Sequence, residues 1–175
     1  MLEPFIQPWS GYAVRHIPES ATDVFDFRYA ARAADNRWNT QGNPTLYLAS
    51  EKDVALAEWA RHLNVDRSVS LINAQRRRVF RLQVRLDFCL NLCNREVWQV
   101  WSLNNAPDSF KDKKYSRAIA DFIRQTTRVQ GIIVPSVAFL DDLSKWCLVI
   151  FLEKLVENPR HFLLEAEEDG FFGLG

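Results

Sequence analysis

The sequence predicts a single α+β domain in which helices flank a mixed or antiparallel sheet. The chain has 175 residues, of which 47% are hydrophobic and 25% charged, values typical of one globular domain. Apolar and polar residues alternate over 79–88, which indicates a half-buried strand. The predicted strands and helices are interspersed without a regular βαβ rhythm, and this favours the α+β class.

The first part of the chain is expected to contribute two short strands. Residues 12–17 form the first, which Pro18 ends. Asn, Gly and Pro residues mark 19–44 as an irregular segment. Residues 45–49 are apolar or aromatic and predict a second, compact strand.

A helix is expected to follow this strand and to end near residue 63. Ser50 is suited to its N-cap, and Glu51 and Asp53 suit the positive end of the helix dipole. Its apolar face consists of Val54, Ala55, Trp59 and Leu63. Glu58 borders that face, so the helix places a carboxylate beside a buried surface.

The middle of the chain is expected to hold the most regular strand and two helices. The strand, 79–88, carries apolar side chains on one face and Arg81 and Arg85 on the other. Residues 95–103 predict a short helix and 115–129 a longer one. The apolar face of the longer helix consists of Ile119, Phe122, Ile123 and Val129. Gly131 is expected to stop it.

Two buried strands and an acidic tail complete the predicted domain. Residues 132–134 form a short strand that Pro135 closes, just before Ser136. Residues 147–152 form a continuous apolar strand. We treat 1–175 as one domain with a motif-bearing core at about 12–152 and a C-terminal extension at about 155–175.

The charges balance overall but are unevenly distributed. The 22 basic and 22 acidic residues cancel, which excludes a bulk polycation that coats nucleic acid. The net charge is −3 over 1–60, +8 over 61–128 and −5 over 141–175. Arginine outnumbers lysine 16 to 6, and arginine suits bidentate recognition of phosphate.

Other signals predict a cytoplasmic protein without a membrane partner or a bound metal. No apolar run approaches the roughly 20 residues of a membrane span, and the N-terminus lacks the pattern of a signal peptide. Cys89, Cys93 and Cys147 do not have the spacing of a zinc site. We therefore expect free thiols in a reducing compartment.

Five polar residues lie where predicted strands, loops and a helix could bring them to one site: Arg15, Arg37, Tyr47, Glu58 and Ser136. Taken singly, each also has a structural explanation, such as a solvated loop arginine or a core tyrosine with a satisfied hydroxyl. Glu58 is the hardest to explain in this way, because a glutamate is rarely buried without a partner.

The combined pattern resembles the signature of the RES-domain family, which is named for its Arg, Glu and Ser. The run from Arg37 to Glu58 carries two contiguous motif blocks. The segment from Gly131 to Ser136 is similar to the third block, and 12–17 is similar to the opening block, which carries another Arg.

This resemblance implies an ADP-ribosyltransferase-like fold and an enzyme that cleaves the nicotinamide–ribose bond of NAD. By the motif, Arg37, Tyr47, Glu58 and Ser136 would form the active site, and Arg15 would help to bind the substrate. Glu58 would stabilise the oxocarbenium-like transition state and hold the ribose hydroxyls. Arg37 and Arg15 would bind the pyrophosphate.

The remaining site residues would orient the nicotinamide half. Tyr47 would stack on the nicotinamide and orient it through its hydroxyl, and Ser136 would hydrogen-bond the ribose or the carboxamide. His62 lies four residues after Glu58 on the same helix face, so it could either pair with Glu58 and orient it or be a surface histidine, and both stay open. The implied substrates are NAD and either inorganic phosphate or water, with no prosthetic group.

The resemblance also implies a partner. The family is typically the toxin of a bacterial toxin–antitoxin pair, so an antitoxin protein is expected to restrain the enzyme. Candidate contacts for it are the region of Trp98 and Trp101 and the tail at Phe171 and Phe172. Self-association stays open.

Two alternatives stay open at this point. The same site could transfer ADP-ribose to a protein side chain. The protein could instead be a nucleic-acid-binding module and not an enzyme. The basic segment would then bind through Arg76, Arg77, Arg78, Arg81 and Arg85. We favour the interpretation that these arginines form a solvated strand face balanced by the acidic tail.

Overall fold

The fold is described from a computed structural model that covers residues 2–32, 36–64, 76–155 and 158–173. Within these ranges, six strands form one sheet. They are β1 (Ile6–Pro18), β2 (Thr45–Ala49), β3 (Arg77–Asn91), β4 (Gly131–Pro135), β5 (Trp146–Phe151) and β6 (Leu163–Phe172). In the same ranges, short 3₁₀ turns and three α-helices connect the strands. The helices are α1 (Lys52–Asn64), α3 (Arg95–Val100) and α4 (Lys113–Thr126).

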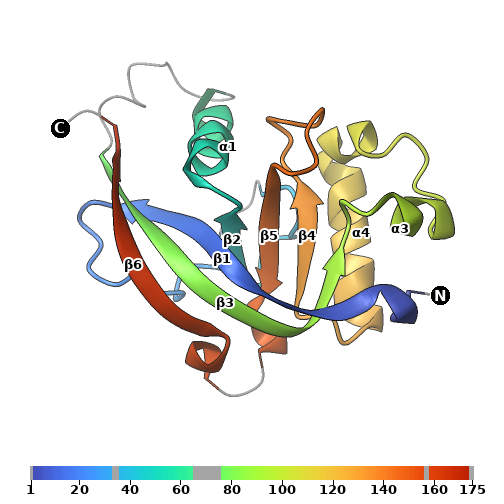
Figure 1. Ribbon diagram of the computed structural model, residues 1–175, viewed down its shortest axis with the longest axis horizontal. Helices are drawn as coiled ribbons and strands as arrows, with labels where there is room; N and C mark the ends of the chain where they lie inside the picture. Colours follow the sequence, from blue (N-terminus) through green and yellow to red (C-terminus); the bar gives the residue numbers. More distant parts are fainter. Residues whose placement is uncertain (1, 33–35, 65–75, 156–157, 174–175) are drawn as a thin grey trace.

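The sheet is mixed, with the order β1-β2-β5-β4-β3-β6. All pairings are antiparallel except that of β3 with β4, which is parallel. β1 also pairs with β3 along most of its length, so β1, β2, β5, β4 and β3 close into a ring. In Figure 1, β1, β3 and β6 form a long curved layer, and β2, β5 and β4 form a second layer behind it.

The strand pattern explains the inner core between these layers. The alternation over 79–88 is confirmed, because Leu82, Val84 and Leu86 are fully buried while Arg81 and Arg85 are exposed. Apolar residues of all six strands meet there, among them Ala13, Leu48, Ile133, Leu148, Ile150 and Leu163.

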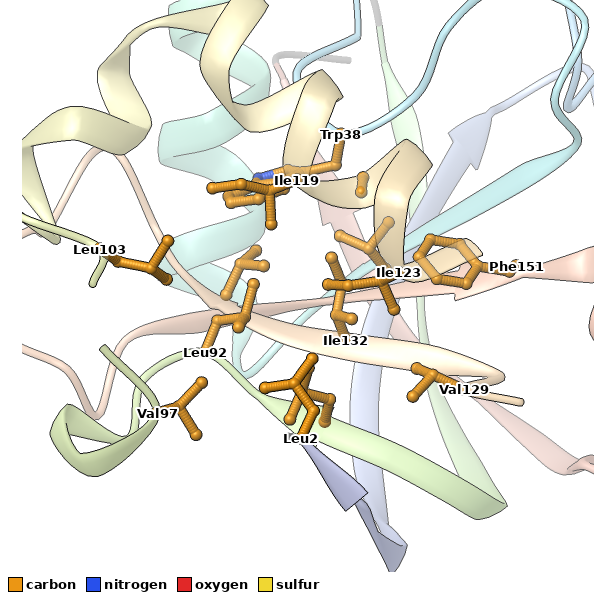
Figure 2. Close-up of a cluster of buried hydrophobic side chains, with 14 of the residues drawn as sticks. Leu2, Trp38, Leu92, Val97, Leu103, Ile119, Ile123, Val129, Ile132 and Phe151 are labelled. Carbon is orange, nitrogen blue, oxygen red and sulfur yellow. The ribbon is translucent and has the colours of Figure 1, made fainter. Parts of the chain in front are cut away.

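α4 lies beside β4 and covers the outer face of the second layer, whereas α1 lies beyond the end of β2 and packs against residues of both layers (Figure 1). Figure 2 shows Ile119 and Ile123 of α4 over Ile132 of β4 and Phe151 of β5. A third cluster under α1 consists of Val14, Ala49, Val54, Ala55, Trp59, Val79 and Phe172. The outer face therefore has two covered areas, one under each long helix.

Several predicted boundaries are wrong for local reasons. Gly131 does not stop a helix, since α4 ends at Thr126 and Gly131 is the first residue of β4. A Cβ at Gly131 would lie 2.8 Å from Leu86 Cδ1 and 3.2 Å from the carbonyl oxygen of Val149, so glycine suits the close packing of the strands there. Ser50 accepts a hydrogen bond from the backbone of Trp146 on β5, and α1 begins two residues later.

Two further predictions differ from the structure. Phe122 was expected on the buried face of its helix, but it is 52% exposed and contacts Trp101 edge-on. The acidic tail was given no element, yet it forms β6 against β3. Only the two ends of β6, Leu163 and Phe172, are buried, so the strand lacks the alternation that would reveal it.

Candidate functional site

A carboxylate and a serine meet at one end of the second layer. Ser136 Oγ donates to Glu58 Oε1 at 2.5 Å, and the backbone N–H of Ala138 donates to the same oxygen at 3.2 Å. Ser136 is almost completely buried, whereas Glu58 is half-buried. Within the described residues, Oε2 of Glu58 makes no hydrogen bond.

The fold brings this pair together from positions 78 residues apart. α1 follows β2 and Ser136 follows β4, and the register runs from Ala49 on β2 through Cys147 on β5 to Val134 on β4. The ends of β2 and β4 therefore lie at the same end of the layer. Trp59 anchors the helix in the cluster under α1, and Glu58, next to it, projects toward the end of β4.

Cys147, on β5, lies at the border of the two clusters on the outer face. It packs against the cluster under α4, which Tyr47 also contacts, and against the cluster under α1. Burial raises the pKa of the Cys147 thiol well above its ordinary value, and the negative charge of Glu58 raises it further. The thiol therefore stays protonated and is a poor nucleophile at neutral pH.

Tyr47 holds the loop that carries Arg37. Its hydroxyl donates to Asn39 Oδ1 at 2.7 Å and accepts from the backbone N–H of Trp38 at 3.0 Å. Burial raises the pKa of Tyr47, so the phenol remains a donor. The sequence-based role for this hydroxyl was to orient nicotinamide, but the structure engages it with Asn39 and Trp38.

Arg37 lies against the segment that precedes α4. Its Nη1 donates to the carbonyl oxygens of Phe110, at 3.0 Å, and Lys111, at 2.5 Å. The neighbouring Trp38 is buried and packs edge-on against Phe110 with ring centroids 5.3 Å apart. The guanidinium therefore has a fixed position at the edge of the area under α4.

Arg15 is not brought to this group of residues. On β1, Ala13 and Ile17 face the inner core, and Arg15 alternates with them on that face. Its guanidinium donates to the carbonyl oxygens of Val24 and Asp26, and burial lowers its pKa to about 10. Because Tyr47 faces the outer side of the sheet, we leave Arg15 out of the proposed substrate site.

Sequence reasoning missed the roles of Asn39 and Cys147. Asn39 lies within the motif run from Arg37 to Glu58 but was given no role, yet its side chain is buried and accepts the Tyr47 hydroxyl bond. No local pattern identifies either residue, because their partners are defined by the tertiary fold. A pairing of Glu58 with His62 lies outside the described residues, as the side chain of His62 is not part of the description.

Comparison with known proteins decides the family. Residues 13–169 match the model of the RES domain. The chain belongs to the RES domain family. A chain in the crystal structure of the M. tuberculosis MbcT–MbcA toxin–antitoxin complex is similar to it, with a TM-score of 0.71 and 18% identity over 94% of this chain and 87% of that chain. No curated protein gives a significant match.

The structural likeness confirms the α+β, ADP-ribosyltransferase-like fold expected from the sequence. In this RES domain the Arg, Glu and Ser of the motif blocks all lie on the outer side of the second layer, near α1, the end of β4 and the start of α4. Within the described residues, no three His, Cys, Asp or Glu side chains cluster as metal ligands do, and no helix is long and apolar enough to cross a membrane.

The arginines of the +8 segment make contacts within this RES domain. Arg78 forms a two-point ion pair with Glu168 of β6 at 2.9 Å, and Arg76 pairs with Glu19 at 3.3 Å. Arg81 lies over the ring of the exposed Tyr12. These contacts with acidic and aromatic groups favour the scaffold interpretation over a nucleic-acid surface.

A hollow in the RES domain lies at the start of α1. Its walls include Tyr12, Arg81, Lys52 and Asp169. Charges of both signs face it, and Lys52 already donates to the carbonyl of Asp169. The hollow therefore favours no single class of ligand.

A buried histidine links α1 to the long strands. His16 accepts a hydrogen bond from Arg77 Nε at 2.7 Å, and its ring packs against Trp59 of α1 and Phe172 of β6 with centroids 5.7 Å away in each case. Burial lowers the pKa of His16 to about 3, and the positive charges of Arg77 and Arg15 contribute. The imidazole is therefore neutral in the folded protein at neutral pH.

The unfolded chain binds a proton at His16 below about pH 6.5, whereas the folded chain does not until about pH 3. The free energy of unfolding should therefore fall as the pH falls through this window. His16 alone should lower it by about 2 kcal/mol between pH 7 and pH 5. Urea unfolding of the wild type and of His16→Gln at both pH values measures the effect. The variant should show a smaller pH dependence, and an equal dependence in both proteins would contradict this assignment.

Proposed function

We propose that this RES domain cleaves the bond between nicotinamide and ribose in NAD and transfers the ADP-ribosyl group to inorganic phosphate or water. The observation that carries the proposal is the Glu58 carboxylate, held through one oxygen by Ser136 and Ala138, while its second oxygen makes no hydrogen bond within the described residues. The match to the RES domain family, which spans Glu58 and Ser136, supports the proposal.

Glu58 acts on the ribose. Cleavage of the glycosidic bond produces positive charge at the anomeric carbon, and a fixed carboxylate stabilises that charge. The two hydrogen bonds to Oε1 fix the carboxylate before the substrate binds, so little reorganisation is needed in the transition state. Ser136 is then a residue that orients Glu58, in addition to any contact with the ribose or carboxamide.

The loop of Arg37 binds the other half of the substrate. The guanidinium of Arg37 suits the pyrophosphate, because bonds between arginine and phosphate are charge-assisted. Tyr47 positions this loop through Trp38 and Asn39, and its ring packs against the cluster under α4, as Cys147 does. Cys147 then forms part of the floor beneath the nicotinamide half.

The reaction needs no prosthetic group. The electron pair of the broken C–N bond goes to the pyridinium nitrogen, so nicotinamide leaves as a neutral molecule. An oxygen of phosphate or water forms the new bond to the anomeric carbon. The products are nicotinamide with ADP-ribose phosphate in the first case, and nicotinamide with ADP-ribose and a proton in the second.

Incubation of the purified protein with NAD, in the presence and in the absence of inorganic phosphate, tests the proposal. We expect release of nicotinamide, and the second product identifies the acceptor. Unchanged NAD under both conditions would reject the proposed reaction. Labelled ADP-ribose on proteins of a lysate, without small products, would instead favour transfer to a protein side chain.

The proposed biological role is that of a toxin with an antitoxin partner, by analogy with the toxin–antitoxin complex whose fold is similar. An enzyme that depletes NAD harms the cell that makes it, so restraint is required. Expression of the wild type alone should stop growth, whereas expression of Glu58→Gln should not. Normal growth with an active wild-type enzyme in the cells would contradict the toxin role.

A further inference from the structure

One face of α4 holds the loop that carries Arg37. The residues Arg117, Asp121 and Arg124 are spaced by four and three positions, so they lie on the same side of the helix. Each of them contacts the segment from Asn36 to Thr45. The loop therefore follows α4 in the same direction, and the helix determines its course.

Asp121 makes the central contacts of this face. Its Oδ2 accepts a hydrogen bond from Thr40 Oγ1 at 2.8 Å, and its Oδ1 accepts from Asn43 Nδ2 at 3.3 Å. Thr40 and Asn43 are the ends of a turn, since the backbone N–H of Asn43 also donates to the carbonyl of Thr40 at 3.2 Å. One carboxylate thus holds both ends of the turn that follows Asn39.

Arg117 and Arg124, at the two ends of this face of α4, differ from Asp121 in what they contact. Arg117 Nε donates to the backbone carbonyl of Asn36 at 2.8 Å. Arg124 is buried, pairs with Glu153 at 2.5 Å and lies over the ring of Phe151, so its loss would disturb the core. Asp121 is half-buried and its hydrogen bonds within the described residues go to this turn.

We propose that Asp121 is a positioning residue for substrate binding: it fixes the 40–43 turn and thereby the guanidinium of Arg37. This inference rests on the proposed function, in which Arg37 binds the pyrophosphate of NAD. Tyr47 and Asp121 hold the loop on either side of Asn39, Tyr47 from the sheet and Asp121 from the helix. Arg37, which contacts Phe110 and Lys111, is placed by both.

Loss of the Asp121 carboxylate should weaken the binding of NAD and leave the chemical step nearly unchanged. Glu58 stays with Ser136 and Ala138, which are far in the chain from the 40–43 turn and do not contact Asp121 in the described part of the structure. We expect Asp121→Ala to raise the KM for NAD by about tenfold or more, with kcat changed by less than about threefold.

A conservative variant separates geometry from charge. In Asp121→Asn the amide oxygen can still accept from Asn43, and the amide N–H₂ can donate to the Thr40 hydroxyl, which is both donor and acceptor. This variant should retain a KM within about threefold of the wild type. Gln125→Ala, at an exposed position of the same helix, is the control for a change in α4.

Hydrogen exchange provides a readout that does not depend on activity. The backbone amides of 37–43 should exchange faster in Asp121→Ala than in Gln125→Ala, while the amides of β4 and β5 stay protected. Steady-state kinetics with NAD on the wild type and the three variants complete the experiment.

The outcomes are distinct. Faster exchange together with a raised KM, and rescue by Asp121→Asn, support the inference. Faster exchange with an unchanged KM overturns it, as does a fall in kcat alone or an unchanged exchange rate of 37–43. A wild type that leaves NAD intact rejects the proposed function, and the exchange of 37–43 still decides whether Asp121 holds the loop.

Discussion

Glu58→Gln is expected to lower the rate of NAD cleavage by about a hundredfold to a thousandfold, because it removes the charge that faces the ribosyl cation. The amide oxygen of the substituted side chain could still accept from Ser136 Oγ and from the backbone N–H of Ala138. The side chain should therefore keep its position, and the loss should appear in kcat. Initial rates of nicotinamide release measure it.

Glu167→Gln is the matched control, since it makes the same chemical change at an exposed position of β6. We expect this variant to keep the wild-type rate, and both variants to keep the thermal midpoint of the wild type within a few degrees. If Glu58→Gln retained wild-type kcat, the carboxylate would have no part in the reaction, and the proposed mechanism would fail.

Phe110→Ala is expected to lower the free energy of unfolding by about 4 kcal/mol. Phe110 is fully buried, and its ring contacts the rings of Trp38, Trp98 and Tyr115. Alanine would leave a cavity under the loop of Arg37, whose guanidinium also bonds to the carbonyl of residue 110. Urea unfolding followed by circular dichroism gives the change in stability.

Phe122→Ala provides the comparison, because it removes the same ring from a position that is 52% exposed. Its one ring contact is with Trp101 among the described residues, and the cost should stay below about 1 kcal/mol. Similar losses for the two variants would show that Phe110 does not form part of a rigid core at this place.

The elements with a strong local pattern could be predicted from the sequence. The strand 45–49 and the alternation of β3 depend only on side-chain type and spacing, and both are confirmed. β6 lacked such a pattern, because most of its side chains on both faces meet solvent. Gly131 was misassigned because a glycine at a close approach of strands and a glycine that ends a helix look alike in sequence.

The candidate site likewise has features that a local sequence pattern predicts and features that it does not. The motif pattern predicted which residue types matter, and the fold places Glu58 with Ser136 and Tyr47 with the loop of Arg37. The direction of the Arg15 side chain could not be predicted, since both faces of β1 pack against apolar clusters around residues 13–17 and only the register decides between them. The bonds from α4 to the 40–43 turn join residues about 80 positions apart, and no local signal encodes them.

The position of β5 has a consequence for the order of events on the ribosome. β5 lies between β2 and β4, although it is made after both of them. The helix of Glu58 follows β2 and Ser136 follows β4, so these two strands cannot come into register until residues 146–151 have been added and have left the exit tunnel. A nascent chain that already contains every motif residue therefore has no assembled carboxylate site, and the proposed activity is withheld from the translating cell until synthesis of the domain is nearly complete.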